Sequence, residues 1–299
     1  RSFDGGKTWS KPRIIADGGD DGMSNVCTLV DRTTGVIWIF TSRISATARA
    51  SEKGGKKAVI DGESGMSLWV TRSRDDGATW SAPEEFTARI QGYDPNMTYH
   101  ANGPGAGIQL RSGRLVVPRY YRWKGSLVSY SHVIYSDDHG RTWRQGQPAG
   151  PYTNEHQVAE LADNVLMMNA RSYHGKNRRA VSISRDGGQT WTEPKLDEAL
   201  IEPVCQAGFI RLTLPGAKRN ALLFSNPAAT TRANMTVRLS YDDGAAWPFA
   251  QALHAGPSAY SSLAALPDGT IGCLYERGEK GPYEKLTYAR FNLEWLTQK

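Results

Sequence analysis

Eight residues decide the fold of this chain: Ser184-Arg185-Asp186-Gly187-Gly188-Gln189-Thr190-Trp191. The same pattern, Ser-x-Asp-x-Gly-x-Thr-Trp, begins again at Ser2, Ser73 and Ser136, and a fifth copy that begins at Ser240 has alanine in place of the threonine. We name these five segments Asp boxes. A pattern that returns in this way is typical of an array of similar supersecondary units.

Each Asp box has the composition of a tight hairpin turn. The aspartate can accept hydrogen bonds from the backbone amides that follow it, and the glycine tolerates a positive φ. The threonine and the tryptophan then re-enter a strand, with the indole lying over the turn. Loop closure accounts for every residue type in the box, so we assign the boxes to folding rather than to catalysis.

Length and composition agree with a repeat-built all-β protein. The 299 residues include 31 Gly, 15 Pro, 9 Trp and 13 Tyr, and this composition, with few long helical patterns, favours many short strands and turns. Division of the chain into six units leaves about 50 residues for each, which fits a four-stranded propeller blade. The sequence therefore predicts a six-bladed β-propeller that forms one domain over residues 1–299.

The pattern of apolar residues predicts individual strands near the N-terminus. Residues 26–30 and 35–40 are expected to form a hairpin of two buried strands. Residues 18–25 are polar and are expected to form a loop. Residues 44–65, rich in Ser, Ala, Lys and Gly, are expected to form a long mobile loop.

Charge and cysteine content limit the function classes. Lys and Arg number 36 against 30 Asp and Glu, a net charge of +6, which favours an acidic ligand without naming it. No basic run with interleaved aromatic residues indicates nucleic-acid binding, and no apolar stretch approaches the length of a membrane span. Cys27, Cys205 and Cys273 lack metal-ligand spacing and are expected to be buried thiols. The oligomeric state is left open.

A second group of polar residues is harder to explain as scaffold. Glu155 lies where one strand pattern begins and Arg171 where its expected hairpin partner ends, so the two side chains could meet at one end of a sheet. Arg232 precedes another strand pattern, Tyr260 stands in a segment rich in Gly, Pro and Ser, and Glu276 closes an apolar run. Taken singly, residues of these types are more often surface or structural.

Taken together with the Asp boxes, these residues resemble the exo-α-sialidase (neuraminidase) family. The resemblance covers nearly the whole chain. Its motifs, in order, are Gly-Pro-Gly-x-Gly-Ile-Gln-Leu, Asn-Glu-x-x-Val-x-Glu-Leu, Asn-Ala-Arg-Ser, Glu-Pro-Val-Cys-Gln, Phe-Ser-Asn-Pro, and Tyr-Ser-Ser-Leu before Leu-Tyr-Glu. The boxes alone are weak evidence because other propellers carry them, whereas the ordered set is specific.

The resemblance implies a role for each of these residues. Tyr260 matches the nucleophile of the family, and Glu155 matches the carboxylate that activates it. Arg171 and Arg232 match the second and third members of an arginine triad that holds the carboxylate of sialic acid, and Glu276 matches the acid that orients the first member. Positions that line the pockets for the glycerol and N-acyl groups are matched by Gln206, Tyr120, Ser24 and Asn25.

The chemistry of the matched set is coherent. Sialic acid carries a carboxylate on its anomeric carbon, so a neutral phenol avoids the repulsion that an anionic nucleophile would meet. The high pKa of a phenol means that it needs an adjacent base. Arginine supplies a planar, two-pronged grip on a carboxylate. The resemblance thus implies a retaining exo-α-sialidase for terminal α-linked sialic acids, with no metal or cofactor, and favours secretion or a periplasmic location.

Several alternatives remain open at this point. The first triad arginine and the general-acid aspartate have no match in this sequence and are expected upstream of the first Asp box, which would also leave the first blade incomplete. A sialoglycan-binding propeller that does not turn over is therefore one alternative. A relative that acts on a variant sialic acid, or a trans-sialidase, is another. Sialylated glycoconjugates or free sialic acid are the expected partners in each case.

Overall fold

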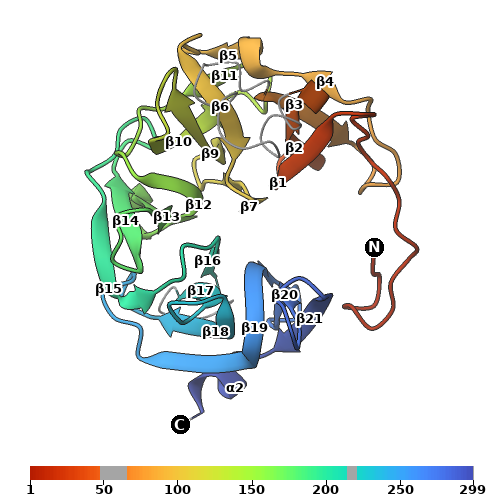
Figure 1. The fold of residues 1–299 in the computed structure, drawn as a ribbon. Helices are drawn as coiled ribbons and strands as arrows, with labels where there is room; N and C mark the ends of the chain where they lie inside the picture. Colours follow the sequence, from red (N-terminus) through yellow and green to blue (C-terminus); the bar gives the residue numbers. More distant parts are fainter. Residues whose placement is uncertain (48–65, 214–220, 299) are drawn as a thin grey trace. The chain divides into compact units, whose positions relative to one another are not determined.

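A computed structural model describes residues 1–47, 66–213 and 221–298 (Figure 1). The chain folds as two compact units, and each is described by itself. The larger unit comprises Ile15–Gly175 and Ala180–Leu196, and the smaller unit comprises Arg1–Ile14, Lys176–Arg179 and Asp197–Lys299. The prediction of one domain over residues 1–299 stays a prediction.

The first sheet of the larger unit is an antiparallel meander in the order β4-β3-β2-β1, with the short β7 pairing in parallel on β1. Its strands are β1 (Gly22–Asp31), β2 (Val36–Ile44), β3 (Met66–Ser73), β4 (Glu84–Glu85) and β7 (Gly105–Ala106). The expected hairpin of residues 26–30 and 35–40 is confirmed by the pairing of β1 with β2.

The polar segment 18–25 is only partly a loop. Its second half belongs to β1, where Gly22 pairs with Ile44 and Ser24 pairs with Ser42. The prediction was wrong there because backbone pairing to a neighbouring strand does not depend on apolar side chains. Most of the expected long loop, residues 48–65, lies outside the described residues.

The second sheet belongs to the larger unit, and the third sheet has residues in both units. The second has the order β5-β11-β10-β9-β6, with β8 also pairing with β9, and the third has the order β12-β13-β14-β15. In the third sheet, the boundaries between the units fall between Arg179 and Ala180 of β14 and between Leu196 and Asp197 of β15. The elements are η1 (Thr87–Arg89), β5 (Ile90–Gln91), β6 (Met97–Asn102), β8 (Ile108–Gln109), β9 (Leu115–Trp123), β10 (Ser129–Ser136), β11 (Trp143–Gln145), β12 (Thr153–Glu160), η2 (Ala162–Asn164), β13 (Leu166–Ser172), β14 (Arg178–Ser184) and β15 (Lys195–Ile201).

The sheet of the smaller unit consists of two meanders that share one strand. Its order is β16-β17-β18-β19-β20-β21. The first half of the 17-residue β19 pairs with β18, and the second half pairs with β20. The elements are β16 (Gly208–Leu212), β17 (Ala221–Pro227), β18 (Ala233–Ser240), β19 (Phe249–Ala265), β20 (Ile271–Arg277), β21 (Lys285–Phe291) and α2 (Leu293–Thr297).

The Asp boxes occupy one fixed place in these meanders. The boxes that begin at Ser73, Ser136, Ser184 and Ser240 each connect the third strand of a meander to the strand that follows it. The repeat in the sequence therefore corresponds to a repeat in the fold. Four of the boxes keep the threonine, and the box that begins at Ser240 does not.

The hydrogen bonds of one Asp box confirm the turn predicted for it. The amide of Thr79 donates to Oδ1 of Asp75 over 2.8 Å, and the Thr79 hydroxyl donates to Oδ2 over 2.6 Å. The amide of Gly77 donates to the Ser73 hydroxyl over 2.8 Å. Trp80 Nε1 donates back to the Gly77 carbonyl over 3.1 Å, so the indole lies over the turn. The Ser, Asp, Gly, Thr and Trp of the pattern all take part in the hydrogen bonds that close the turn.

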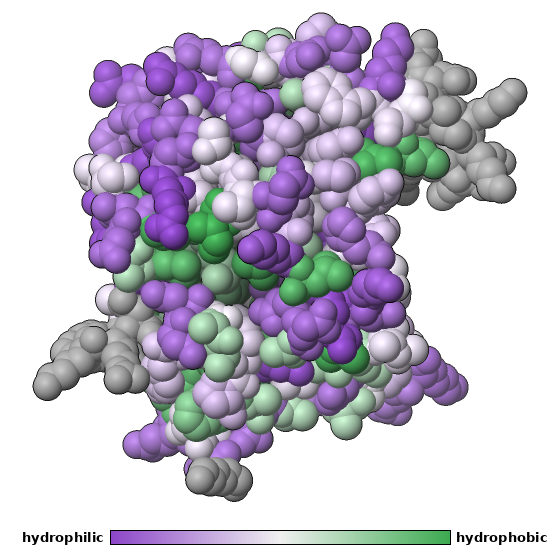
Figure 2. Space-filling model, turned by 90° about the vertical axis from the view of Figure 1, so that its left-hand side faces the viewer, coloured by the Kyte–Doolittle hydropathy of each residue, from purple (hydrophilic) through white to green (hydrophobic). Residues whose placement is uncertain are grey.

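The cores of the two units are apolar and their surfaces are mainly polar. Phe40, Trp38 and Trp143 form an aromatic cluster in the larger unit, with Phe40 and Trp143 ring centroids 5.3 Å apart. Cys27, Cys205 and Cys273 are buried and free, as the sequence predicts. Figure 2 shows one face, on which hydrophilic residues outnumber hydrophobic ones. No helix in the described ranges is long and apolar enough to span a membrane.

Candidate active site

A β-bulge occurs in β1, β6, β12 and the second half of β19, and three of the bulges carry predicted site residues. In each bulge two residues lie opposite one residue of the neighbouring strand. Bulges bend a strand and re-aim its side chains, and they are frequent beside active sites. The pairs are Asn25 and Val26 opposite Thr41, Tyr99 and His100 opposite Tyr121, Asn154 and Glu155 opposite Arg171, and Ala259 and Tyr260 opposite Glu276.

The bulge in β12 brings Glu155 and Arg171 together, as the sequence predicts. Arg171 Nη1 donates to Oε2 of Glu155 over 2.6 Å, and the two side chains are 15% and 7% exposed. The Arg171 guanidinium also lies 5.1 Å from the centroid of the Tyr173 ring. Arginine is always charged and presents its donors in a fixed plane, so the pair orients the Glu155 carboxylate at this sheet end.

A second group in the larger unit joins Asn25 to Tyr120. Asn25 has a φ of 49°, which its place in the β1 bulge requires. Its side-chain amide donates to the Tyr120 hydroxyl over 3.0 Å and to the Asn102 carbonyl over 3.2 Å. Ser24 lies next to it and donates weakly to the Ser42 carbonyl over 3.5 Å. The bulge thus connects Asn25 and Tyr120, two of the residues expected to line the pocket.

In the smaller unit, three of the predicted residues meet at the β19 bulge. The backbone amide of Tyr260 donates to Oε2 of Glu276 over 2.9 Å. The Arg232 guanidinium lies 5.6 Å from the centroid of the Tyr260 ring, within the range of a cation–π contact. Arg232 also donates to the hydroxyl of Tyr283, an exposed residue that sequence reasoning missed. Glu276 therefore holds the backbone of Tyr260, and Arg232 lies over its ring.

Gln206 has a role that sequence reasoning missed. It is 2% exposed, and its side-chain Nε2 donates to the Ser261 carbonyl over 3.0 Å, while its Oε1 accepts from the Ser261 amide over 3.0 Å. The Ser261 hydroxyl donates to the Ser225 carbonyl over 2.8 Å. We name these residues, Gln206, Ser225 and Ser261, the Ser261 clamp. The clamp fixes the residue directly after Tyr260.

A buried ion pair supports the segment that carries Gln206. Arg179 and Glu202 are both fully buried, and Arg179 Nη1 donates to Glu202 Oε2 over 2.9 Å. The same Nη1 donates to the Cys205 carbonyl over 2.7 Å. Removal of either partner would leave an uncompensated buried charge, which is strongly unfavourable. The pair thus ties the residue before Gln206 to β14.

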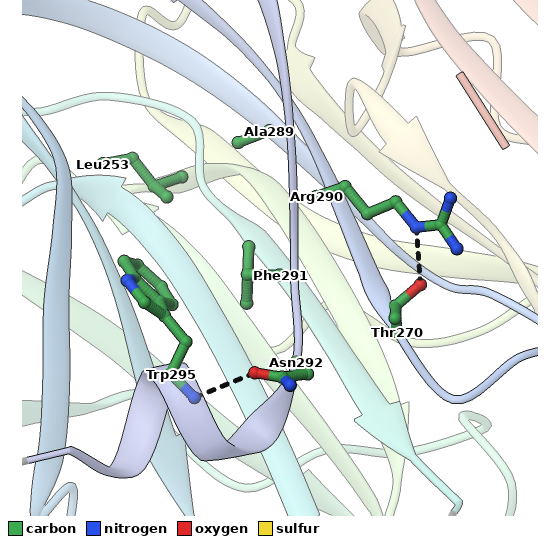
Figure 3. A pocket seen from close by; sticks show the side chains of 7 residues that line it. All are labelled: Leu253, Thr270, Ala289, Arg290, Phe291, Asn292 and Trp295. Atoms are coloured by element: carbon green, nitrogen blue, oxygen red, sulfur yellow. Dashed lines mark hydrogen bonds between the residues drawn. The ribbon is translucent and has the colours of Figure 1, made fainter. Parts of the chain in front are cut away.

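A cavity of the smaller unit lies at a different place. It has a volume of about 620 Å³ and contains none of the predicted site residues (Figure 3). Its polar side chains serve local structure, since Arg290 Nε donates to Thr270 over 2.9 Å and Asn292 caps α2 through the amide of Trp295. The remaining lining residues are Leu253, Ala289 and Phe291. We do not assign the site to this cavity.

Metal chemistry has no obvious place in the described residues. Among them, no group of three or more His, Cys, Asp or Glu side chains could hold a metal ion. The groups assembled at the bulges are instead arginines, carboxylates and tyrosines. Such groups suit recognition of an anionic ligand and acid–base chemistry.

Comparison with known proteins identifies the family. A family model described as a BNR repeat-like domain matches residues 1–273. Sialidases of Micromonospora viridifaciens and Bacteroides fragilis are each 36% identical to the chain and match 99% and 92% of it. Sialidase-3 of Bos taurus is 30% identical, and the match covers 89% of the chain and 74% of that protein. The chain belongs to the sialidase family.

Solved sialidase structures agree with this assignment. The Hadza microbial sialidase is 34% identical, with a TM-score of 0.87, and the match covers 99% of this chain and 59% of that one. The intramolecular trans-sialidase of Ruminococcus gnavus is 20% identical, with a TM-score of 0.78 over 100% of this chain and 88% of that one, and shows the fold alone. The all-β, propeller-like architecture is thus confirmed, and the number of six blades stays a prediction.

The sialidase relatives differ from the chain in length. The chain spans 46% of the Micromonospora sialidase and 53% of the Bacteroides sialidase, about half of each. Within this sialidase-family chain, the larger unit holds Glu155 and Arg171, and the smaller unit holds Tyr260, Arg232 and Glu276. The predicted pairing of Tyr260 with Glu155 joins residues of different units and stays a prediction.

Proposed function

We propose that this chain is the catalytic part of a retaining exo-α-sialidase that hydrolyses terminal α-linked sialic acids of glycoconjugates. Tyr260 is the proposed nucleophile, and Glu155 is the proposed base that activates it. Membership of the sialidase family and the ordered motifs that contain these residues support the proposal. The finer description of the fold as a six-bladed propeller belongs to the same proposal.

One observation carries the proposal further than the family assignment. Tyr260 is held from two sides, with Glu276 accepting from its backbone amide and the Ser261 clamp fixing the next residue. Arg232 lies over its ring. A nucleophile must be held in one geometry for efficient attack, and a tyrosine with only a folding role would not need this much support.

The proposed chemistry follows from the groups present. The phenol oxygen of Tyr260 attacks the anomeric carbon while its proton passes to Glu155, and the glycosidic bond breaks as the leaving oxygen receives a proton from a group that we do not assign. Water then attacks the anomeric carbon of the aryl glycoside formed with Tyr260 and gives a proton to the group that protonated the leaving oxygen, while Glu155 returns its proton to the phenol oxygen. Two displacements at one carbon give net retention.

The arginines are proposed to bind the substrate carboxylate. A planar guanidinium grips a carboxylate with two parallel hydrogen bonds, and Arg171 and Arg232 are assigned to this contact. Asn25, Ser24 and Tyr120 are assigned to the glycerol and N-acyl groups of the sugar. Gln206 is assigned to the support of Tyr260, because its amide already binds both backbone groups of Ser261.

Trapping of the intermediate tests the proposal. A fluorinated sialosyl fluoride should accumulate a covalent adduct, because fluorine slows the second displacement more than it slows the first. Peptide mass spectrometry should then place one sialyl group on the peptide that contains Tyr260. Product analysis with natural sialosides should give free sialic acid. An adduct on another residue would contradict the assignment of the nucleophile, and a product formed by transfer would contradict hydrolysis.

A further inference from the structure

Arg119 is a buried charged residue of the larger unit, and two of its three side-chain nitrogens have no hydrogen-bond partner among the described residues. It lies in β9 with 1% of its surface exposed, and its Nε and Nη2 atoms have no hydrogen-bond acceptor among the described residues. None of the ion pairs in that part of the chain includes it. Burial of a charged group without compensation is strongly unfavourable, so these unused donors favour a bound ligand.

The residues around Arg119 are also rich in donors. His132 lies directly opposite Arg119 on β10, is 1% exposed, and has no hydrogen-bond partner at either ring nitrogen. Directly opposite residues of an antiparallel pair point to the same face of the sheet. The Tyr121 ring lies 5.1 Å from the His132 ring, and its hydroxyl also lacks a partner. Three side chains thus bring unused donors to one buried face.

One hydrogen-bond acceptor on this face also lacks a partner, but it can accept only some of the unused N–H and O–H groups. Asn102 lies opposite Arg119 on β6, and its Oδ1 has no hydrogen-bond partner among the described residues. An amide oxygen has two lone pairs, whereas a guanidinium has five N–H groups. Asn102 is also neutral, so it cannot compensate the charge of Arg119.

Arg119 is the charged group of this cluster at neutral pH. Burial lowers its pKa to about 9, which leaves it mostly protonated at pH 7. Burial lowers the pKa of His100 to about 3 and that of His132 well below its usual value, so both rings are neutral. Burial raises the pKa of Cys27 to about 12 and also raises that of Tyr93, so neither supplies a negative charge.

We propose that Arg119 and His132 bind a monovalent inorganic anion such as chloride between β6, β9 and β10. A monovalent anion matches a cluster that carries one positive charge, and the guanidinium and the imidazole N–H supply its hydrogen bonds. The site is separate from the proposed sugar site, because neighbouring residues of a strand point to opposite faces and Arg119 therefore points away from Tyr120. The anion connects the strands and stabilises the folded state.

Halide replacement in crystals tests the site directly. Crystals of the whole chain grown in sodium bromide should give an anomalous peak within hydrogen-bond distance of Arg119 Nε or Nη2 and of His132. Bromide has the same charge as chloride, and its X-ray absorption edge gives an anomalous signal. Ordered water at this position, with no anomalous signal, would overturn the proposal, since water can satisfy the donors without an anion.

Stability in solution supplies a second measurement. The thermal midpoint should rise with chloride and then saturate when ionic strength is kept constant with gluconate, a much larger monovalent anion, because a ligand of the native state stabilises it. Arg119→Met should weaken the apparent chloride affinity at least about tenfold. Arg122→Met, on the same strand but bonded to Ser129, should keep it. Equal chloride dependence in all three proteins would contradict the proposal. If Arg119→Met does not fold, the bromide crystals decide.

Discussion

The Asp boxes and the bulges repeat in different ways. The boxes that begin at Ser73 and Ser136 repeat the same pattern of residues and the same hydrogen bonds. The bulges repeat only a backbone irregularity, and their residues differ: Asn25, Glu155 and Tyr260 have no chemistry in common. A repeat with constant residues indicates a folding role, whereas a repeat with constant geometry and changing residues leaves room for function.

This difference predicts that substitutions in the boxes and substitutions at the bulges have different effects. A change in a box should lower stability and leave activity per folded molecule unchanged. A change at a bulge should lower activity with a smaller effect on stability. Each of the following experiments compares the two regions or two copies within one of them.

The largest effect is expected for Tyr260→Phe, which removes only the phenol oxygen. Activity on an aryl sialoside should fall by roughly 10³-fold or more, since loss of a nucleophile usually costs at least this much. The affinity for free sialic acid, measured by calorimetry, should change less than about tenfold. Tyr135→Phe, at a buried tyrosine of β10, is the matched control and should retain activity. Normal turnover by Tyr260→Phe would refute its role.

Arg171→Lys and Arg232→Lys should each weaken the binding of free sialic acid by about 1–3 kcal/mol, because a two-pronged contact becomes a point contact. Calorimetric titration measures this loss. Arg111→Lys serves as the control, since its side chain is half exposed and pairs with Glu160. Unchanged affinity in both the Arg171 and the Arg232 variant would show that the carboxylate binds elsewhere.

Sequence patterns could predict the boxes but not the bulges. A box is local, so its eight residues contain all the partners of the turn. The bulge at Glu155 depends on the register between β12 and β13, and a one-residue offset between two strands leaves no mark on the sequence of either. Strand patterns place Glu155 and Arg171 at one sheet end, but the roles of the site residues could be inferred only through a family resemblance. The same limit applies to Arg119, whose lack of a partner depends on three strands.

Gln206 has contacts that the resemblance does not specify. The resemblance assigns Gln206 to the sugar pocket, which stays a prediction, and the structure shows its side-chain amide bonded to both backbone groups of Ser261. A glutamine has four hydrogen-bonding sites, and nothing in the sequence says whether a ligand or the backbone uses them. Sequence analysis also missed the ion pair of Arg179 with Glu202. Its two partners are 23 positions apart in the chain, and no local pattern connects them.

Gln206→Ala should lower kcat by about tenfold and change KM little, because the Tyr260 backbone loses support while the arginines remain. The buried Ser261 groups left without partners should also lower the free energy of unfolding by about 1–3 kcal/mol. Gln109→Ala removes the side-chain bonds to Arg32, Asp31, Thr33 and Gly113, and should destabilise without the fall in kcat. Equal losses of activity in both variants would show that Gln206 contributes only to stability and does not position Tyr260.

Acid should destabilise the boxes. Hydrogen bonds from the Thr79 hydroxyl and amide, and from Ser73, lower the pKa of Asp75 to about 2, against 3.8 for an ordinary aspartate. Because the pKa is lower in the folded state, the carboxylate stabilises the fold above about pH 4, and this contribution is lost as the pH falls toward 2. Asp75→Asn should flatten the dependence of the thermal midpoint on pH in this range. Asp76→Asn in the same turn should leave it steep, and identical profiles would contradict the assignment.

The smallest effect is expected where one box departs from the pattern. Ala246 donates its amide to Asp242 over 2.9 Å but has no hydroxyl to donate, whereas in the neighbouring box Thr190 donates both. The indole of Trp247 donates to Asp197 over 3.3 Å rather than to its own turn. Ala246→Thr should add the missing bond and raise the thermal midpoint by about 1–2 °C, since an exposed hydrogen bond contributes about 0.5 kcal/mol. Thr190→Ala should lower the midpoint by a similar amount, and neither change should alter kcat. If Ala246→Thr destabilises the protein, the contact of Trp247 with Asp197 already replaces the hydroxyl, and this box has a second way of closing that the other four do not share.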